Sequence, residues 1–244
     1  MKGGIFFHWT MKNVVVAVGG SLLRPEIEER SSWLEDLAEL VKEHISSGIR
    51  LGIVVGGGSP ARESIKLVEN IINDVLALDR IGISATRLNA SIIKEVFQNS
   101  GINVSDKIPD DIAQAVIMMK KYDVVVMGGT LPGHTTDKVA IELAISTNSE
   151  KCIIATNVNK VYDKDPRKNE NAKSFDEMSI HELQEIVGPA KHAKAGASQV
   201  VDPVGVSLAV ESNLTLNILD GRKVKNIKNA VQGNVFEGTI VKGD

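Results

Sequence analysis

Three stretches of the sequence place glycine and hydroxyl side chains directly after a run of apolar residues. They read "VAVGGSLL" from residue 16, "IVVGGGSPAR" from residue 53 and "VVVMGGTLPGHTTD" from residue 124. Glycine lets a ligand approach the main chain closely, and successive amide N–H groups at a helix N-terminus bind anions. One such turn is equally consistent with a plain tight turn. Three of them after strands predict a multi-phosphate site at one edge of a sheet.

The side chains around these turns suit phosphoryl transfer, which requires positioning and charge neutralisation more than covalent chemistry. Thr135 and Thr136 offer hydroxyl donors, and one of them is expected to cap the following helix. His134 can donate to an anion or simply pack in the turn. Asp137 can serve a metal or a ligand hydroxyl, or only complement the helix dipole. Arg62 lies one turn beyond the second glycine turn and can reach back over it.

A fourth stretch, "ATNVNKVYDKDP" from residue 155, follows another apolar run. Thr156 and Asn157 stand where a strand ends, and Tyr162 can lay its ring on a nucleotide base. Asp163 and Asp165 can bind ribose hydroxyls, or shape the turn before the proline. This stretch indicates a nucleoside pocket only in combination with the glycine turns.

Five apolar runs have strand length and lack alternation, which is typical of strands buried on both faces. They cover residues 13–18, 51–55, 123–127, 151–155 and 214–219. Segments with helical spacing separate them. The alternation predicts an α/β fold with a mainly parallel sheet covered on both sides.

Capping signals mark where the helices begin and end. Ser32 with Glu35 is expected to form a capping box, and Gly48 to end that helix. Ser59 is expected to cap the next helix, and further helices start at "DVLALDR", "PDDIAQ" and "TTDKVA". Residues 158–174 are polar and predict an exposed loop or hairpin.

The composition narrows the function classes. The chain is 43% hydrophobic and 24% charged with a net charge of -3, so no basic field favours nucleic acid or membrane as a partner. Cys152 is the single cysteine, which excludes an internal disulfide and predicts a small buried side chain. The sequence holds no P-loop, no GxGxxG fingerprint, no zinc spacing and no GxSxG elbow.

The chain is expected to form one compact domain over residues 13–244, preceded by an N-terminal extension over residues 1–12. Met11 is a possible alternative start. No apolar run has the length of a membrane span, and the first residues do not form a convincing secretory signal. We therefore expect a cytoplasmic protein.

Taken in order, "VGGS", "VVGGGSPAR", "LDRIGISATRLNA", "MGGTLPGHTTD" and "TNVNKVYDKDP" resemble the amino acid kinase superfamily, most closely its archaeal-type uridylate kinases. The resemblance covers Asn13 to the C-terminus. It implies a three-layer αβα sandwich, a homohexamer, and Mg²⁺-ATP-dependent phosphorylation of UMP to UDP in pyrimidine biosynthesis. It also implies an acceptor-binding half over about residues 13–150 and an ATP-binding half over about residues 151–244.

The resemblance assigns residues to each nucleotide but implies no metal ligand from the protein. The residues implied for ATP are Gly20, Ser21, Gly58, Arg62, Thr156, Asn157, Tyr162 and Asp165. Those implied for UMP are Gly57, Asp79, Thr130, Leu131, Pro132, Gly133, His134, Thr135 and Thr136. Asp79 is implied to hold the ribose hydroxyls.

The sequence departs from the family at two places. Many members carry a lysine two residues before the first glycine pair, where this chain has Ala17. Transfer between two anions still needs positive charge, for which Arg62 and one of Lys12, Lys160 and Lys194 are candidates. The second departure is "NVNKVY", in which Lys160 replaces a more usual glycine, either as that charge or as a variant turn residue. Arg62 and Lys160 are the residues expected to act in catalysis.

Two other functions remain open at this level. A kinase of the same fold could act on an amino acid, a carbamate or isopentenyl phosphate, although Asp79 and the "PGHTTD" loop favour a nucleotide acceptor. A nucleotide-binding protein without catalysis is the other alternative, because Ala17 removes a charge that many of the family's enzymes carry.

Overall fold

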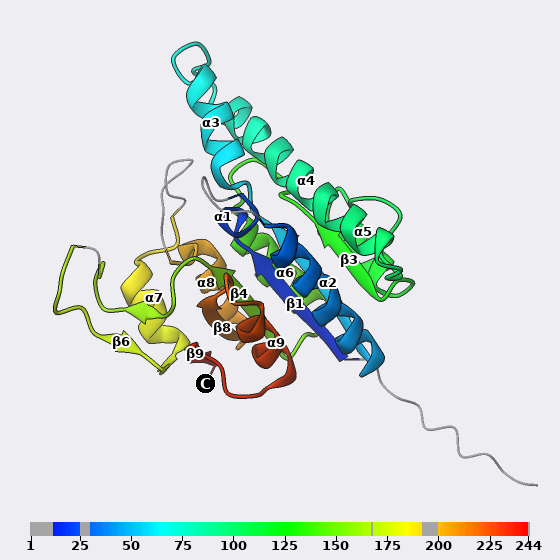
Figure 1. Cartoon of the computed structure of the whole chain (residues 1–244). Helices are drawn as coiled ribbons and strands as arrows, with labels where there is room; N and C mark the ends of the chain where they lie inside the picture. The colour runs from blue at the N-terminus through cyan, green and yellow to red at the C-terminus, as the bar shows by residue number, and fades with distance from the viewer. Residues whose placement is uncertain (1–11, 25–29, 167, 192–199, 244) are drawn as a thin grey trace, which may run out of the picture.

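The computed structural model describes residues 12–24, 30–166, 168–191 and 200–243. A seven-stranded sheet with the order β3-β2-β1-β4-β8-β9-β7 forms its centre (Figure 1). Its strands are β1 (Lys12–Val18), β2 (Ile49–Val55), β3 (Val124–Met127), β4 (Lys151–Thr156), β7 (Glu177–Ser179), β8 (Thr215–Asp220) and β9 (Gly238–Lys242). The first five strands of that order run parallel, so their carboxyl ends share one edge of the sheet.

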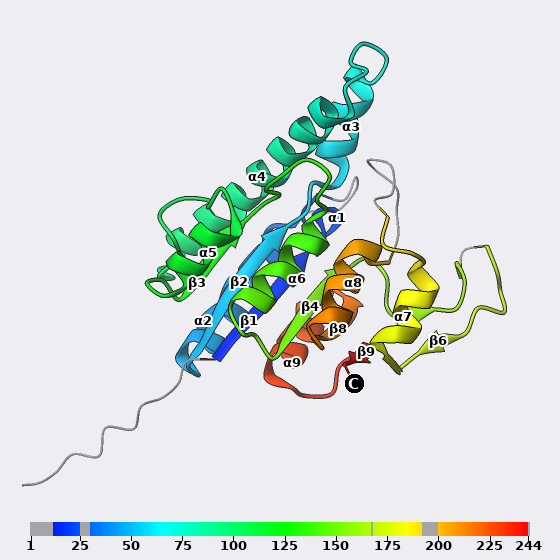
Figure 2. The ribbon, with the colours of Figure 1, turned by 180° about the vertical axis from the view of Figure 1, so that it is seen from behind.

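Helices cover both faces of this sheet (Figures 1 and 2). They are α1 (Gly20–Leu23), α2 (Ser31–Ser46), α3 (Gly58–Val68), α4 (Val75–Asn99), α5 (Ile112–Met119), α6 (Thr136–Ser146), α7 (Ile180–Val187), α8 (Pro203–Glu211) and α9 (Val224–Gln232). Helices α2, α4 and α9 pack on one face, and α5, α6, α7 and α8 on the other. The predicted three-layer αβα sandwich with a mainly parallel sheet is confirmed.

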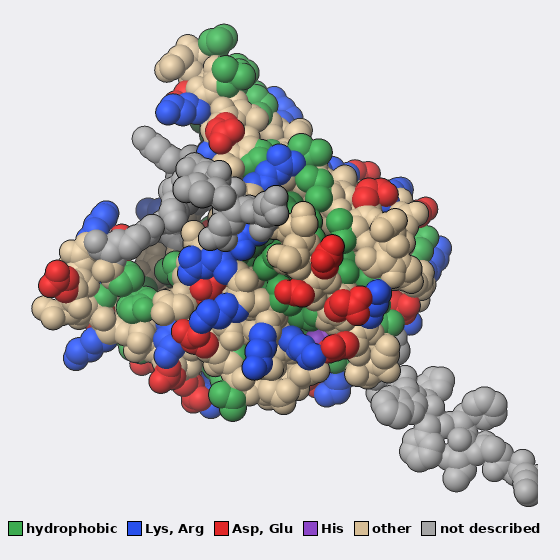
Figure 3. All heavy atoms as spheres, viewed as in Figure 1, with side chains coloured by type: hydrophobic (Ala, Val, Ile, Leu, Met, Phe, Trp, Pro, Cys, Tyr) green, Lys and Arg blue, Asp and Glu red, His purple; other side chains and the backbone are tan. Residues whose placement is uncertain are grey.

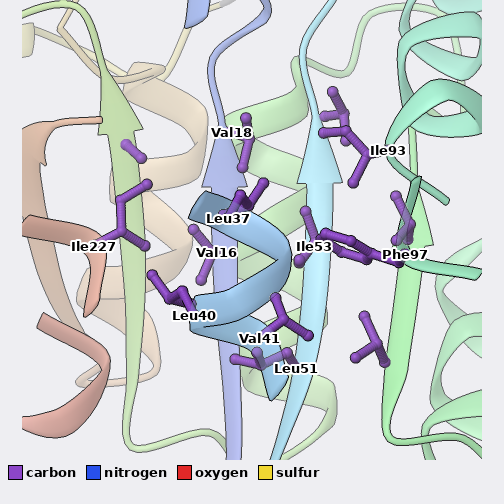
Figure 4. Close-up of a cluster of buried hydrophobic side chains, with 14 of the residues drawn as sticks. Val16, Val18, Leu37, Leu40, Val41, Leu51, Ile53, Ile93, Phe97 and Ile227 are labelled. Carbon is purple, nitrogen blue, oxygen red and sulfur yellow. The ribbon is translucent and has the colours of Figure 1, made fainter. Parts of the chain in front are cut away.

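The lack of alternation in the strand sequences follows from this double cover. Val16 and Val18 of β1 face α2, where they join Leu37 and Ile53 in one apolar cluster (Figure 4). The alternate residue Ala17 faces the other way and lies in the cluster under α6. Since successive strand side chains point to opposite faces, both faces must be apolar, which accounts for the uninterrupted apolar runs.

All five expected strands are present, as β1, β2, β3, β4 and β8. The sequence reading missed β7 and β9, which are short and lie at the far side of β8. Strand β9 runs antiparallel to β8, so the sheet is not parallel throughout. The polar stretch at 158–174 was expected to be a loop or a hairpin. It forms a hairpin, because β5 (Val161–Tyr162) pairs antiparallel with β6 (Ser174–Phe175).

Two expected helix caps are wrong. Ser32 lies inside α2, whose N-cap is Arg30 without a side-chain cap, so the expected capping box does not form. Ser59 lies inside α3 and donates to the backbone oxygen of Arg24 instead. The helix after "GGG" begins earlier because Gly58 already belongs to its first turn. Gly48 follows α2 at φ 78, as expected for the end of a helix.

Helix α3 and the first turns of α4 extend beyond the sheet at one end of the molecule (Figure 1). No residue of α3 is buried, although Leu67 near its end is apolar and 79% exposed. No helix in the described residues combines the length and apolar character that a membrane span requires. Residues 1–11 of the expected extension lie outside the described part, and Lys12 is the first residue of β1.

Candidate active site

The glycine turns meet at the carboxyl edge of the parallel strands. The N–H of Gly19, after β1, donates to the carbonyl of Ala155 in β4 at 2.8 Å. The N–H of Gly56, after β2, donates to the carbonyl of Val18 at 2.8 Å. These bonds continue the ladder beyond the strands and fix the first two turns side by side, at the edge where α/β sheets bind ligands.

Direct backbone contact between the first two turns explains their glycines. A Cβ atom on Gly20 would lie 2.1 Å from the nitrogen of Gly58 and 2.6 Å from the carbonyl oxygen of Gly56. Gly58 also has φ +62, and a Cβ there would lie 2.5 Å from the oxygen of Gly20. No residue with a side chain fits at either position without moving the other turn. The turns therefore present two adjacent main-chain surfaces to one ligand region.

Helix α4 fastens these turns and the third one through a row of polar side chains. Asn89 is fully buried and donates from Nδ2 to the carbonyls of Gly56 and Gly57, at 2.8 and 3.0 Å. Thr86 accepts from the N–H of Gly129 at 2.7 Å. One helix thus sets the spacing between the second and third turns.

Asp79, nearer the start of the same helix, continues this row. Its carboxylate accepts a hydrogen bond from the N–H of Gly133 at 2.7 Å, and Gly133 has φ +79. The loop 130–136 is thereby tied to α4 at the carboxylate expected to read a ribose. The structure places Asp79 beside the loop with which the sequence grouped it.

The third turn leads into α6, whose start packs against the start of α8. Thr135 caps α6 by accepting from the N–H of Lys138 at 3.2 Å, so the cap expected from one of the two threonines is present. Its hydroxyl donates to Oδ2 of Asp202 at 2.6 Å, and Asp202 in turn caps α8. Gly205 permits this approach, because a Cβ there would lie 3.2 Å from Cα of Lys138. Two helix N-termini, both favourable to anions, converge beside the loop.

Asp137, in the first turn of α6, lies in this convergence. Its carboxylate accepts a hydrogen bond from the backbone of Asp202 and feels the charge of that residue. Burial, followed by the negative charge of Asp202, raises the pKa of Asp137 to about 6. Two neighbouring carboxylates at a phosphate site are unfavourable unless a cation joins them.

The residues expected around ATP lie along β4, β5 and the segment between them. Thr156 ends β4 and its carbonyl accepts from the N–H of Gly221, after β8, at 2.8 Å. Asn157 follows with an exposed side chain. The hydroxyl of Tyr162 donates to Asn159 at 3.0 Å, which holds the ring over this segment. Asp165, in the turn beyond β5, accepts at its carbonyl from the N–H groups of two later residues.

Not every predicted residue has a defined contact. Arg62 is exposed on α3 and makes no hydrogen bond or ion pair with the described residues. Leu131 is 58% exposed at the tip of the acceptor loop. Gly20 and Ser21 form the first turn of α1, in contact with the second glycine turn. Arg62 and Leu131 are thus exposed side chains, whereas the glycine turns form the edge itself.

The three lysine candidates differ sharply in position. Lys12 begins β1 and forms an ion pair with Glu150 at 3.0 Å. It lies at the opposite edge of the sheet, about 20 Å away along seven strand residues. Lys160 forms an ion pair with Asp176, and that hydrogen bond raises the pKa of its ammonium group. Lys194 lies outside the described residues.

Sequence reasoning missed several residues that organise the site, namely Thr86, Asn89, Lys138 and Asp202. Thr86 and Asn89 stand seven and ten residues after Asp79, so helical periodicity would have put all three on one face. Asp202 precedes a proline at a helix start, which is a readable capping signal. The buried Cys152 is confirmed as a core residue, and burial raises the pKa of its thiol, which removes it as a nucleophile.

Comparison with known proteins agrees with this geometry. Residues 12–220 match the model of the amino acid kinase family. A uridylate kinase of Methanococcus vannielii is 36% identical over 94% of this chain and 99% of its own. The crystal structure of uridylate kinase from Archaeoglobus fulgidus superimposes with a TM-score of 0.80 at 35% identity, over 93% of this chain and 99% of that one.

A more distant structure supports the fold alone. The UMP kinase of Bacillus anthracis superimposes with a TM-score of 0.78 over 96% of both chains, at 23% identity. The family match, the two archaeal relatives and the convergent glycine turns agree over nearly the whole length. The chain belongs to the amino acid kinase family and, within it, to the uridylate kinases.

Proposed function

We propose that this protein transfers the γ-phosphoryl group of ATP to UMP, giving UDP and ADP. The observation that carries the proposal is the meeting of three glycine turns at one sheet edge, with Asp79 bound to the third. The archaeal relatives that match over nearly their full length are named uridylate kinases. Phosphate-binding main chain and a fixed carboxylate for the ribose are what a nucleotide acceptor requires.

The chemistry needs little from the protein beyond placement. An oxygen of the UMP phosphate attacks the γ-phosphorus of ATP in line, and the bond to the β,γ-bridging oxygen breaks. The attacking oxygen is already ionised, so no general base is needed. The N–H groups of the first two turns and the starts of α3 and α6 neutralise charge on the phosphates. Arg62, exposed on α3 one turn beyond the second glycine turn, is the side chain that we propose adds positive charge to them.

The acceptor side distinguishes UMP from the other substrates of this fold. Asp79 accepts from Gly133 with one oxygen, at 2.7 Å, and a carboxylate has further acceptor sites for ribose hydroxyls. An acceptor without a ribose would leave the remaining acceptor sites of the Asp79 carboxylate without a ligand. The geometry therefore favours a nucleotide over a carbamate, an amino acid or isopentenyl phosphate.

Magnesium is expected with ATP, and the residues present fit it. Mg²⁺ prefers carboxylate and phosphate oxygens, and Asp137 and Asp202 lie together beside the loop. The resemblance implies no metal ligand from the protein, but we propose that these two carboxylates would help to hold a Mg²⁺ ion bound to the nucleotide phosphates, where it would neutralise charge. The described residues contain no cluster of three or more metal-ligating side chains. Phosphate oxygens and water are the other ligands that Mg²⁺ usually takes.

We extend the proposal to organisation. The continuous sheet supports one domain, with an acceptor half over about residues 13–150 and an ATP half over about residues 151–244. The exposed apolar surface of α3 supports self-association, for which we propose a homohexamer. We also propose that the protein acts in the cytoplasm, in pyrimidine biosynthesis, because both ATP and UMP are supplied there.

The test is ADP release from Mg²⁺-ATP with UMP, CMP, dUMP, AMP, glutamate, carbamate and isopentenyl phosphate as acceptors. Turnover with UMP well above the others supports the proposal. Turnover on an acceptor without a nucleoside would show that the pocket is assigned wrongly. Binding of nucleotides without any turnover would show a binding protein.

A further inference from the structure

Many amino acid kinases carry a lysine at the position that Ala17 occupies in β1, and no charged residue stands there in this chain. Ala17 is 2% exposed and packs in the apolar cluster with Val139 and Ala140 of α6. Positive charge that serves the same side of the sheet must therefore come from another element. Helix α6 covers that side and starts at the acceptor loop (Figure 2).

Lys138, in the first turn of α6, brings an ammonium group to this place. Its side chain is only 12% exposed, which is unusual for a lysine. The Nζ atom lies 3.2 Å from Nδ1 and 3.1 Å from Nε2 of His134, in the acceptor loop. Helical side chains lean toward the N-terminus of their helix, so Lys138 points toward the loop.

The other contact of Lys138 does not explain its burial. Glu142 lies one turn further along α6, and its carboxylate is 3.4 Å from Nζ. Its side chain is 41% exposed, and pairs of this spacing on a helix surface stabilise little. The shorter contacts are those with His134, on the side of the ligand.

The ammonium group has more donors than the described chain has acceptors for it. Lysine carries three N–H donors, and a neutral imidazole accepts at one nitrogen. Within the described residues, His134 and Glu142 account for two of the three. We infer that Lys138 directs its remaining N–H to the phosphate of the acceptor nucleotide, and so supplies the positive charge that Ala17 does not. This inference rests on the proposed function and concerns the same site.

On this inference, different residues bind the phosphate and the nucleoside of the acceptor. Asp79 and the loop around Gly133 recognise the sugar side, whereas Lys138 meets the phosphate. Removal of the ammonium group should therefore weaken UMP and leave uridine unaffected. A structural role of Lys138 would weaken both ligands equally.

The experiment measures binding of UMP and of uridine by calorimetry in the full chain, together with UMP turnover. The variants are Lys138→Met, Lys138→Gln and Lys138→Arg. Lys42→Met is the control, because Lys42 forms a helix-surface pair with Glu39 at 2.7 Å on α2. We expect the two neutral variants to bind UMP about 10- to 100-fold more weakly, with uridine affinity unchanged. Lys138→Arg should recover most of the preference, and Lys42→Met should resemble the native protein.

Lys138→Gln serves if the methionine variant does not fold, since it keeps a polar group at the same place. An unchanged ratio of UMP to uridine affinity in a folded neutral variant would overturn the inference, as would an arginine variant as poor as the neutral ones. Native turnover of UMP tests the proposed function separately. A native protein that phosphorylates UMP while its Lys138 variants keep the native ratio would refute only the role of Lys138.

Discussion

Asn89 shows how a buried side chain can shape a site without touching the ligand. Its amide holds two carbonyls of the second glycine turn, at 2.8 and 3.0 Å, and thereby turns the N–H groups of that turn toward the sheet edge. The side chain of Asn89 is fully buried and its bond to Gly56 is buried, so water cannot replace that bond. Asn89 is a positioning residue for the phosphate-binding main chain.

We predict that Asn89→Ala and Asn89→Asp lower both stability and activity. Loss of the donors leaves two buried carbonyls unpaired, which costs about 1–3 kcal/mol. The aspartate keeps the size but sets oxygen against oxygen, so it should be the worse of the two. Urea unfolding and kcat/KM for UMP measure the effects.

Asn103→Ala is the control for Asn89, because its side chain is exposed and donates only to Asp123, at 3.1 Å. That variant should unfold and turn over like the native protein. If Asn89→Ala did no more harm than Asn103→Ala, the turn would not depend on the buried amide.

Asp137 gives the site a pH dependence of stability. Its pKa is raised from 3.8 to about 6 by burial and by Asp202. Because the folded pKa lies above the unfolded one, the folded state favours the protonated carboxyl. As pH rises from about 4 to about 6, the unfolded chain releases this proton first, so the free energy of unfolding falls.

We predict that Asp137→Asn stabilises the protein without ligands at pH 7.5 by about 2 kcal/mol, since each pKa unit is worth about 1.4 kcal/mol and partial exposure reduces the total. The gain should largely disappear at pH 4.5, where the native carboxyl is protonated. Urea unfolding at both pH values, without Mg²⁺ and nucleotide, measures it. An equal gain at both would show that the charge of Asp137 is not responsible.

At the scale of elements, the contact between the starts of α1 and α3 determines whether a phosphate site exists. Gly58 and Gly101 form a matched pair for a test. Both have positive φ, +62 and +78, but a Cβ on Gly58 would lie 2.5 Å from the oxygen of Gly20, whereas one on Gly101 meets nothing within 4 Å. The first substitution adds a steric clash to the backbone strain that both share.

We predict that Gly101→Ala costs about 1–2 kcal/mol through strain alone and leaves turnover near the native value. Gly58→Ala should cost about 1–3 kcal/mol more and reduce kcat/KM about 100-fold, because it separates the two turns. Urea unfolding and UMP turnover compare them. Equal stability and activity in the two variants would mean that the turns are not in contact.

The elements also show what the sequence could and could not predict. Strands β1, β2, β3, β4 and β8 were readable because burial on both faces leaves uninterrupted apolar runs. Strands β7 and β9 were not, because three and five residues at the side of a sheet carry little pattern. Ser59 failed as a cap because the backbone contact between Gly20 and Gly58, which one sequence does not show, fixes the start of α3. Ser32 failed because α2 already begins at Ser31, without a side-chain cap.

The sequence likewise predicted some features of the site and not others. The glycine turns were predictable, since only close main-chain contact explains glycine after three strands. The sequence predicted that Asp79 and Gly133 lie near the same nucleotide, but it did not predict the hydrogen bond between them. The sequence could not distinguish Lys138 from other lysines, because what sets it apart is its burial and its distance from His134. Both depend on the tertiary structure.

At the scale of the whole molecule, the α3–α4 projection carries apolar side chains that none of the described residues covers. Leu67, Ile71, Val75 and Leu76 are 79%, 78%, 61% and 53% exposed. Figure 3 shows hydrophobic side chains on the projecting end of the molecule. The four residues lie within ten residues, from the end of α3 to the start of α4, so they are concentrated at one end of the molecule. Exposed apolar surface of this kind on a folded protein marks a contact with another protein, and under the proposed homohexamer that partner is a second copy of this chain.

We predict that Leu67→Glu combined with Ile71→Glu lowers the number of subunits, because each assembly contact would bury a charge without a partner. Light scattering after size-exclusion chromatography gives the mass, in multiples of 26.3 kDa. The fold of each subunit should survive, since surface substitutions change stability by about 0.5 kcal/mol or less. Val235→Glu is the control, since Val235 is 93% exposed elsewhere, and it should leave the mass unchanged. A double variant with the native mass would place the assembly contact on another surface, and a monomeric native protein would refute the hexamer itself.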